Sequence, residues 1–296
     1  MEYLFEFPSL GRRDLSALKK SIDAGFREFS RTYGETLETL FYPILKFLIW
    51  FEKLLINTPW PIIMIVIAAL CYFGARSWKL SLGAIISFAG IGVLGMWENT
   101  MATMAIISVA TILCITIGIP IGILMAKSDR TQAIITPVLD VMQTIPAFVY
   151  LVPVVMLLGI GKVPGLLAVC IYAIPPIVRL TNLGIRLVDS EIIEAANSFG
   201  ASYSQRLFGV QLPLALPNIF AGVNQTIMMA LSMVVIASMI GVKGLGVPVL
   251  QAVANQYLAL GLMNGLAIVC LAIIFDRVSQ KFGKRLQSHR EGEHNV

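Results

Sequence analysis

A short polar segment, residues 189–213, holds the residues whose types and spacing best suit binding to a partner protein. It lies between long apolar runs and contains Glu194-Ala195-Ala196, then Gly200, then Leu212-Pro213. The chemistry expected here is non-covalent, because the two alanines keep one surface flat enough for close approach by another chain. A membrane protein has little local reason to build such a polar loop unless something outside the bilayer holds it.

The local signals in this segment predict two short helices separated by a turn. Asp189 and Ser190 are good N-cap residues, and Glu191 suits the positive end of a helix dipole. Gly200 is able to take the left-handed conformation that ends a helix, and Ser202 with Gln205 predicts a capping box for the second helix. The first helix has one apolar face, formed at helical spacing by Ile192, Ala195, Ala196 and Phe199.

The spacing of this segment resembles the EAA motif of the membrane subunits of ATP-binding-cassette importers. That motif is Glu-Ala-Ala, three residues, Gly, nine residues, Ile, one residue, Leu-Pro, and here Val210 replaces the Ile. The resemblance implies that residues 186–213 form a cytoplasmic coupling loop that docks on an ATPase. The implied contact residues are Glu194, Ala195, Ala196, Phe199, Gly200, Leu212 and Pro213. An amphipathic helix lying on lipid is the alternative for this segment.

The composition predicts an all-α membrane protein. Hydrophobic residues make up 57% of the 296 residues and charged residues only 13%, so the long apolar runs are expected to cross a bilayer. The modest excess of basic residues fits the positive-inside rule, and no basic stripe with interleaved aromatics suggests nucleic acid. The sequence lacks a Walker A motif, a nucleophile–base pair and a metal-ligand cluster. We therefore expect no enzyme activity, metal or cofactor on this chain, and ATP-Mg on a partner.

The positions of the apolar windows divide the chain into three predicted regions. Residues 1–57 form a polar extension ending in an amphipathic interfacial helix at 40–56, for which a short or tilted span is the alternative. Residues 58–280 form the transmembrane domain, and residues 281–296 form a basic polar tail. Prolines are expected to break helices at Pro120, Pro146, Pro153 and Pro175-Pro176. Seven spans are predicted, at about 59–75, 80–97, 101–126, 135–160, 163–185, 214–240 and 257–276.

Polar groups inside the fourth and sixth spans are candidates for a translocation pathway. A carboxylate within an apolar segment is costly, so Asp140 either has a role on the pathway or is an interfacial or packing group paired with Arg130 or Arg179. Hydrogen bonding between helices and core packing are the alternatives for the others. The full candidate set is Asp140, Gln143, Thr144, Phe148, Tyr150, Asn224 and Met233.

The same two spans carry a second resemblance. LDVMQTIPAFVYLVPVVMLLGIG and AGVNQTIMMALSMVVIASMIG are similar to the membrane subunit of the glycine betaine/proline betaine importers. The resemblance implies a type I importer permease fold and a homodimer in a bacterial or archaeal plasma membrane. It also implies two cytoplasmic ATPase subunits and an extracytoplasmic binding protein that delivers a quaternary ammonium solute. Rival functions are the same machine carrying choline or carnitine, and a stand-alone channel or secondary transporter.

Overall fold

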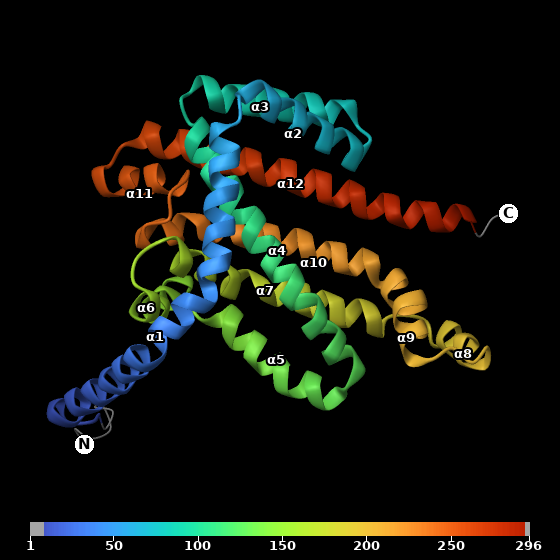
Figure 1. Ribbon diagram of the computed structural model, residues 1–296, viewed down its shortest axis with the longest axis horizontal. Helices are drawn as coiled ribbons and strands as arrows, with labels where there is room; N and C mark the ends of the chain where they lie inside the picture. The colour runs from blue at the N-terminus through green and yellow to red at the C-terminus, as the bar shows by residue number, and fades with distance from the viewer. Residues whose placement is uncertain (1–8, 294–296) are drawn as a thin grey trace, which may run out of the picture.

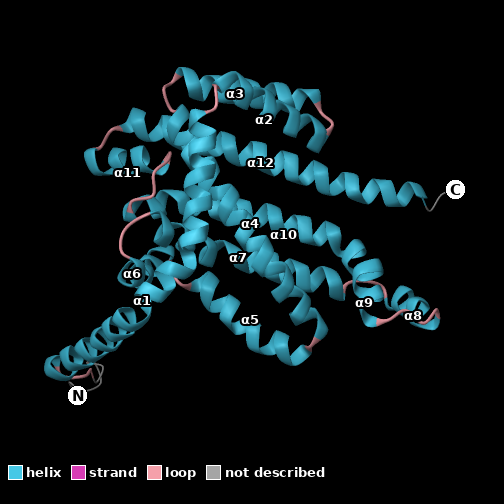
Figure 2. Cartoon of the chain, in the orientation of Figure 1, coloured by secondary structure: helices cyan, strands magenta, loops and turns pink. Residues whose placement is uncertain are grey.

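The computed structural model describes residues 9–293, with side chains described through residue 283, and this part of the chain consists of helices joined by short turns (Figure 2). This confirms the all-α class. In chain order the helices are α1 (Arg12–Asn57), α2 (Trp60–Ala75), α3 (Trp78–Val93), α4 (Trp97–Lys127), α5 (Asp129–Thr144), α6 (Ala147–Leu158), α7 (Lys162–Arg186), α8 (Ser190–Ser198), α9 (Tyr203–Arg206), the π-helix η2 (Leu207–Gln211), α10 (Leu212–Ala237), the 3-10 helix η3 (Ser238–Ile240), α11 (Gly246–Asn255) and α12 (Leu258–Glu293).

The centre of the molecule is formed by α4, α7 and α10, which pack side by side (Figure 1). Glycines let these helices approach closely, as is usual between membrane helices. A Cβ added at Gly122 of α4 would lie 2.6 Å from the Thr181 Cβ of α7, and one added at Gly222 of α10 would lie 3.1 Å from the Ile177 Cα. The glycine positions therefore set the spacing of the three central helices.

A second layer covers one side of this centre. Helix α12 packs beside α10, and the α2–α3 hairpin lies over α12 (Figure 1). The α2–α3 turn, α8, α9 and the C-terminal end of α12 lie toward the same end of the molecule, whereas the N-terminal end of α1 lies at the opposite end. These segments carry basic residues, with Arg76 at the α2–α3 turn, Arg206 in α9, and Arg277 and Lys281 in α12, so basic loops are grouped at this end of the molecule.

Among the described residues, four helices are long and apolar enough to cross a membrane: α4, α7, the continuous stretch Tyr203–Ile240, and α12. Two bent pairs, α1 with α2 and α5 with α6, raise the number to six if each is one span, and α3 is a shorter apolar helix. Each of the seven predicted spans falls on one of these helices or pairs, but the number of crossings stays a prediction.

The expected proline breaks are mostly wrong. Pro120 lies inside α4, Pro153 inside α6, and Pro175-Pro176 inside α7, all of which continue through them. A proline removes one helical hydrogen bond, and the surrounding helices hold the rest of the helix in place. Only Pro146 lies at a break, where Ile145 is extended because a proline disfavours the helical conformation of the residue before it. The predicted span 135–160 is therefore two helices, α5 and α6, bent by 101°.

Both ends of the chain are more helical than the sequence patterns suggested. The predicted helix at 40–56 is the last part of α1, which bends by 109° into α2. The Ser30 Oγ donates to the Met156 carbonyl at 2.7 Å, and Glu52 pairs with Lys162, so α1 is fixed to the end of α6 and the start of α7. The predicted tail at 281–296 begins as a continuation of α12. Residues 1–8 and 294–296, and side chains from 284 onward, lie outside the described part.

Candidate functional site

The polar segment forms the two predicted short helices, α8 and α9. The Asp189 carboxylate accepts from the Glu191 N–H at 2.9 Å and caps α8. Gly200 has φ of 77°, the left-handed conformation expected of it. The Ser202 Oγ accepts from the Gln205 N–H at 3.4 Å while the Gln205 Oε1 accepts from the Ser202 N–H at 2.8 Å, so the predicted capping box is confirmed. Local hydrogen bonds thus form the cap of α8 and the capping box of α9.

Helix α8 has no buried residue. Phe199, at its C-terminal end, is 92% exposed, and Ile192 and Ala195 are also exposed. An aromatic side chain left in water at the tip of a loop is unfavourable by itself, and fully burying it would contribute about 1.5–3 kcal/mol. The apolar face predicted for this helix is therefore uncovered and suited to a partner protein.

Side-chain contacts that the sequence analysis missed tie α8 to the helices behind it. The Arg206 Nη1 donates to the Asn197 Oδ1 at 2.8 Å, across the Gly200 turn, and Arg206 also lies over the Tyr203 ring. Lys127, at the end of α4, also lies over the Tyr203 ring, with its Nζ 4.9 Å from the ring centroid. The Asn197 and Lys127 contacts join separate helices, so no local spacing signals them, whereas Arg206 and Tyr203 are three positions apart within α9.

Arg186, at the C-terminal end of α7, is a second junction that the sequence analysis missed. Its Nη2 donates to the Met125 carbonyl at 2.9 Å, its Nε donates to Asn182 at 3.0 Å, and its Nη1 lies 2.6 Å from the Asp129 carboxylate. One side chain thus joins the ends of α4 and α7 to the start of α5, directly before the loop that carries α8. The loop that carries α8 therefore begins next to a side chain that contacts three helices, and it continues into α10 through η2.

The predicted pathway residues divide into two groups. Asp140 pairs with Arg179 of α7, which settles the choice between Arg130 and Arg179. These two side chains are 56% and 37% exposed, and Gln143, Thr144 and Phe148 are exposed as well. This group lies along α5 and the start of α6, on a surface that the single chain leaves open.

The other three candidates are held inside the helix packing. Met233 is fully buried, and the buried Tyr150 donates its hydroxyl to the Met142 carbonyl across the bend between α5 and α6. The Asn224 Nδ2 of α10 donates to the Asp276 carboxylate of α12 at 2.7 Å. These contacts favour packing and helix-joining roles over the pathway role predicted for these residues.

Comparisons with known proteins agree with this geometry. Residues 118–288 match the family model described as binding-protein-dependent transport system inner membrane component. The chain is 50% identical over 243 residues to the glycine betaine/proline betaine transport system permease protein ProW of Escherichia coli strain K12, covering 80% of this chain and 67% of that protein. It is 46% identical to the glycine betaine/carnitine transport permease protein GbuB of Listeria monocytogenes, covering 78% and 82%.

A solved structure supports the fold. A chain of the MetNI methionine ABC transporter in an inward-facing conformation superposes with a TM-score of 0.58 at 19% identity, covering 64% of this chain and 95% of that one. The helices from α5 to α12 and the α8–α9 loop lie largely within the region matched by the family model, together with the C-terminal third of α4. The chain belongs to the family of binding-protein-dependent transport system inner membrane components, the permease subunits of ATP-binding-cassette importers.

Proposed function

We propose that this chain is the permease subunit of an ATP-driven importer for glycine betaine or a related quaternary ammonium osmoprotectant. The observation that carries the proposal is the identity of 50% to a permease named for glycine betaine and proline betaine. The uncovered face of α8 supports the coupling part of the proposal, because it provides an apolar surface on the same side as the basic loops.

In this proposal, two copies of the chain assemble in a bacterial inner membrane with two cytoplasmic ATPase subunits and an extracytoplasmic binding protein. The ATPases bind ATP-Mg. Residues Glu194, Ala195, Ala196, Phe199 and Gly200 contact the ATPase, with Leu212 and Pro213 beginning the return to the membrane. The binding protein selects the cargo.

The coupling route follows the contacts around α8. When the ATPases close, α8 moves with them and carries α9 through the Arg206–Asn197 hydrogen bond. Helix α10 follows through η2, and Arg186 passes the displacement to α4, α5 and α7. The open surface of α5 and the start of α6, with Asp140, Gln143, Thr144 and Phe148, faces the pathway between the two copies.

The proposal is tested by reconstituting the chain in liposomes with its ATPase and binding protein. Labelled glycine betaine, with choline and carnitine in parallel, is followed after ATP is added on the ATPase side. We expect ATP-dependent accumulation of glycine betaine that disappears when the binding protein is omitted. Accumulation of choline or carnitine alone would keep the importer proposal and change the proposed cargo to that solute. Equilibration without ATP would overturn the importer proposal and favour a channel or secondary transporter.

A further inference from the structure

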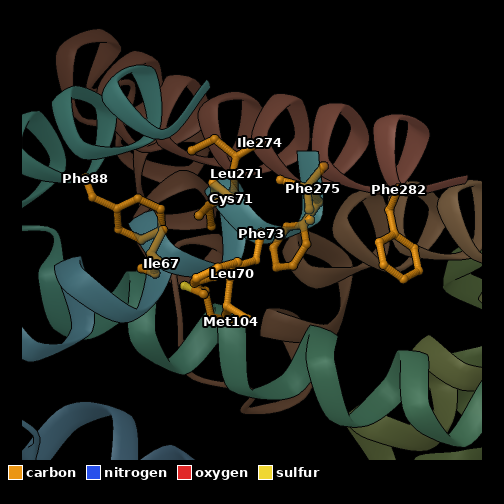
Figure 3. Close-up of a pocket in the computed structure, with 12 residues that line it drawn as sticks. Ile67, Leu70, Cys71, Phe73, Phe88, Met104, Leu271, Ile274, Phe275 and Phe282 are labelled. Carbon is orange, nitrogen blue, oxygen red and sulfur yellow. The ribbon is translucent and has the colours of Figure 1, made fainter. Parts of the chain in front are cut away.

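An apolar cavity lies between α2 and α12, away from the loop and the α5 surface described above (Figure 3). Its volume is about 460 Å³, within the range of about 300–1,000 Å³ that is usual for small-molecule sites. The lining includes Leu70 and Phe73 of α2 and Phe275 and Phe282 of α12, with contributions from Phe88 of α3 and Met104 of α4. The lining is aliphatic and aromatic except for the thiol of one cysteine, Cys71.

The cavity is elongated along α12. Phe88 lies at one end of the row of side chains and Phe282 at the other (Figure 3). The lining residues of α12 run from Leu271 to Phe282, which is about 16 Å of helix. A charged or zwitterionic solute would lose its hydration there without gaining a polar partner, so the cavity does not suit the cargo. A hydrocarbon chain fits both its shape and its chemistry.

Three basic residues are close in sequence to residues that line the Phe282 end of this cavity. Arg76 follows the lining residue Gly74 and ends α2, while Arg277 and Lys281 are sequence neighbours of the lining residues Val278 and Phe282. All three basic side chains are exposed, and none has an ion-pair partner among the described residues. The nearest acidic residue on α12, Asp276, is hydrogen bonded to Asn224 of α10. Three positive charges are therefore free at one end of an apolar slot.

The expected position of this cavity in the membrane agrees with an apolar slot that has basic residues near one end. The α2–α3 turn that carries Arg76 lies toward the same end of the molecule as α8 and α9 (Figure 1), where the basic loops indicate the cytoplasmic leaflet. Of the four long spans, α12 has the smallest buried share, 17% of its most apolar window, so lipid has direct access to it. Basic sites between helices at this level are suited to anionic headgroups.

We propose that this cavity binds an anionic phospholipid of the leaflet on the α8–α9 side. One acyl chain lies along α12 between Phe88 and Phe282, and the headgroup phosphate contacts Arg76, Arg277 and Lys281. The lipid joins the α2–α3 hairpin to α12. This site is independent of the cargo, so it stands or fails separately from the proposed transport function.

Native mass spectrometry of the purified full chain tests the proposal. The protein is incubated with phosphatidylglycerol and phosphatidylcholine in equal amounts, with identical acyl chains. We expect one phosphatidylglycerol retained per chain, with about a tenfold preference over phosphatidylcholine, since each basic residue near the surface adds attraction for an anionic lipid. The triple variant Arg76→Gln, Arg277→Gln, Lys281→Gln should lose this preference. Its matched control removes the same charges on α1, with Arg12→Gln, Arg13→Gln and Lys19→Gln, and should keep it.

A second variant tests the apolar slot itself. Leu70 is 64% exposed, so Leu70→Trp fills the cavity from its rim and should lower retention of both lipids by about tenfold. Ile65→Trp changes a residue of the same helix that is 68% exposed and does not line this cavity, and it should retain lipid like the unmodified chain.

Four outcomes would overturn the proposal. Equal retention of the two lipids by the unmodified chain excludes an anionic site. Unchanged lipid preference in the triple variant, or unchanged lipid retention in Leu70→Trp, would show that the lipid does not bind at these residues. A dimer that Leu70→Trp dissociates, with lipid binding unchanged, would assign the face to a second copy of the chain instead.

Discussion

The centre formed by α4, α7 and α10 and the loop formed by α8 and α9 are built in opposite ways. The central helices bury residues along their length, with glycines at their closest approaches, whereas α8 buries none. The centre is complete within the chain, and the loop offers its apolar side chains to something else. The difference implies that substitutions in the centre damage folding, while substitutions in the loop leave the fold intact and damage coupling.

The largest effect is expected in the centre, from Gly122→Leu. A Cβ at this position would already lie 2.8 Å from the Val178 carbonyl oxygen, so a larger side chain forces α4 and α7 apart. Overpacking of this kind costs about 1–3 kcal/mol or more, and we expect the variant to lose its monodisperse peak in size-exclusion chromatography.

The matched control for this prediction is Gly265→Leu on α12, where an added Cβ meets nothing within 4 Å. That variant should elute and unfold like the unmodified chain. Equal behaviour of the two variants in a thermal unfolding assay would mean that the glycine contacts do not set the spacing of the central helices.

In the loop, Gly200→Trp should leave the fold intact and abolish coupling. The left-handed backbone at φ of 77° costs about 1–2 kcal/mol for a residue with a side chain, so the turn between α8 and α9 should change shape. We expect assembled complexes that hydrolyse ATP but import cargo at least tenfold more slowly. Normal uptake together with normal assembly would contradict the coupling role of this loop.

A smaller loss is expected from Phe199→Ser, which removes the exposed aromatic ring at the end of α8. If this ring is buried by the ATPase, its loss should cost about 1.5–3 kcal/mol, or roughly tenfold or more in affinity for the ATPase. Binding is measured by titration of the purified chain with the ATPase. Phe29→Ser on α1, also an exposed ring, is the control and should bind normally; equal binding by both variants would remove Phe199 from the interface.

The smallest effect is expected from Asn197→Ala and Arg206→Gln, which break the hydrogen bond between α8 and α9. One exposed hydrogen bond contributes about 0.5–1.5 kcal/mol, so uptake should fall by a few-fold while the affinity for the ATPase changes little. The double variant should be no worse than the stronger single variant, because both act on one contact. Additive losses in uptake rate would show that the two residues act separately.

The sequence by itself determined the all-α class and the shape of the α8–α9 loop. The cap at Asp189, the turn at Gly200 and the capping box at Ser202 and Gln205 join residues within a few positions of one another, so spacing alone identifies them. The apolar windows also located the main helices, because a helix that crosses a bilayer needs about 20 apolar residues in succession.

The tertiary structure decided the rest. It selected Arg179 over Arg130 as the partner of Asp140, placed Met233 in the core, and kept α7 helical through Pro175-Pro176. It also brought the ends of α4, α5 and α7 together at Arg186. These features depend on which helix faces which, and that choice comes from small residues meeting across helices far apart in the sequence. No local pattern records such a meeting, so only the packed molecule reveals it.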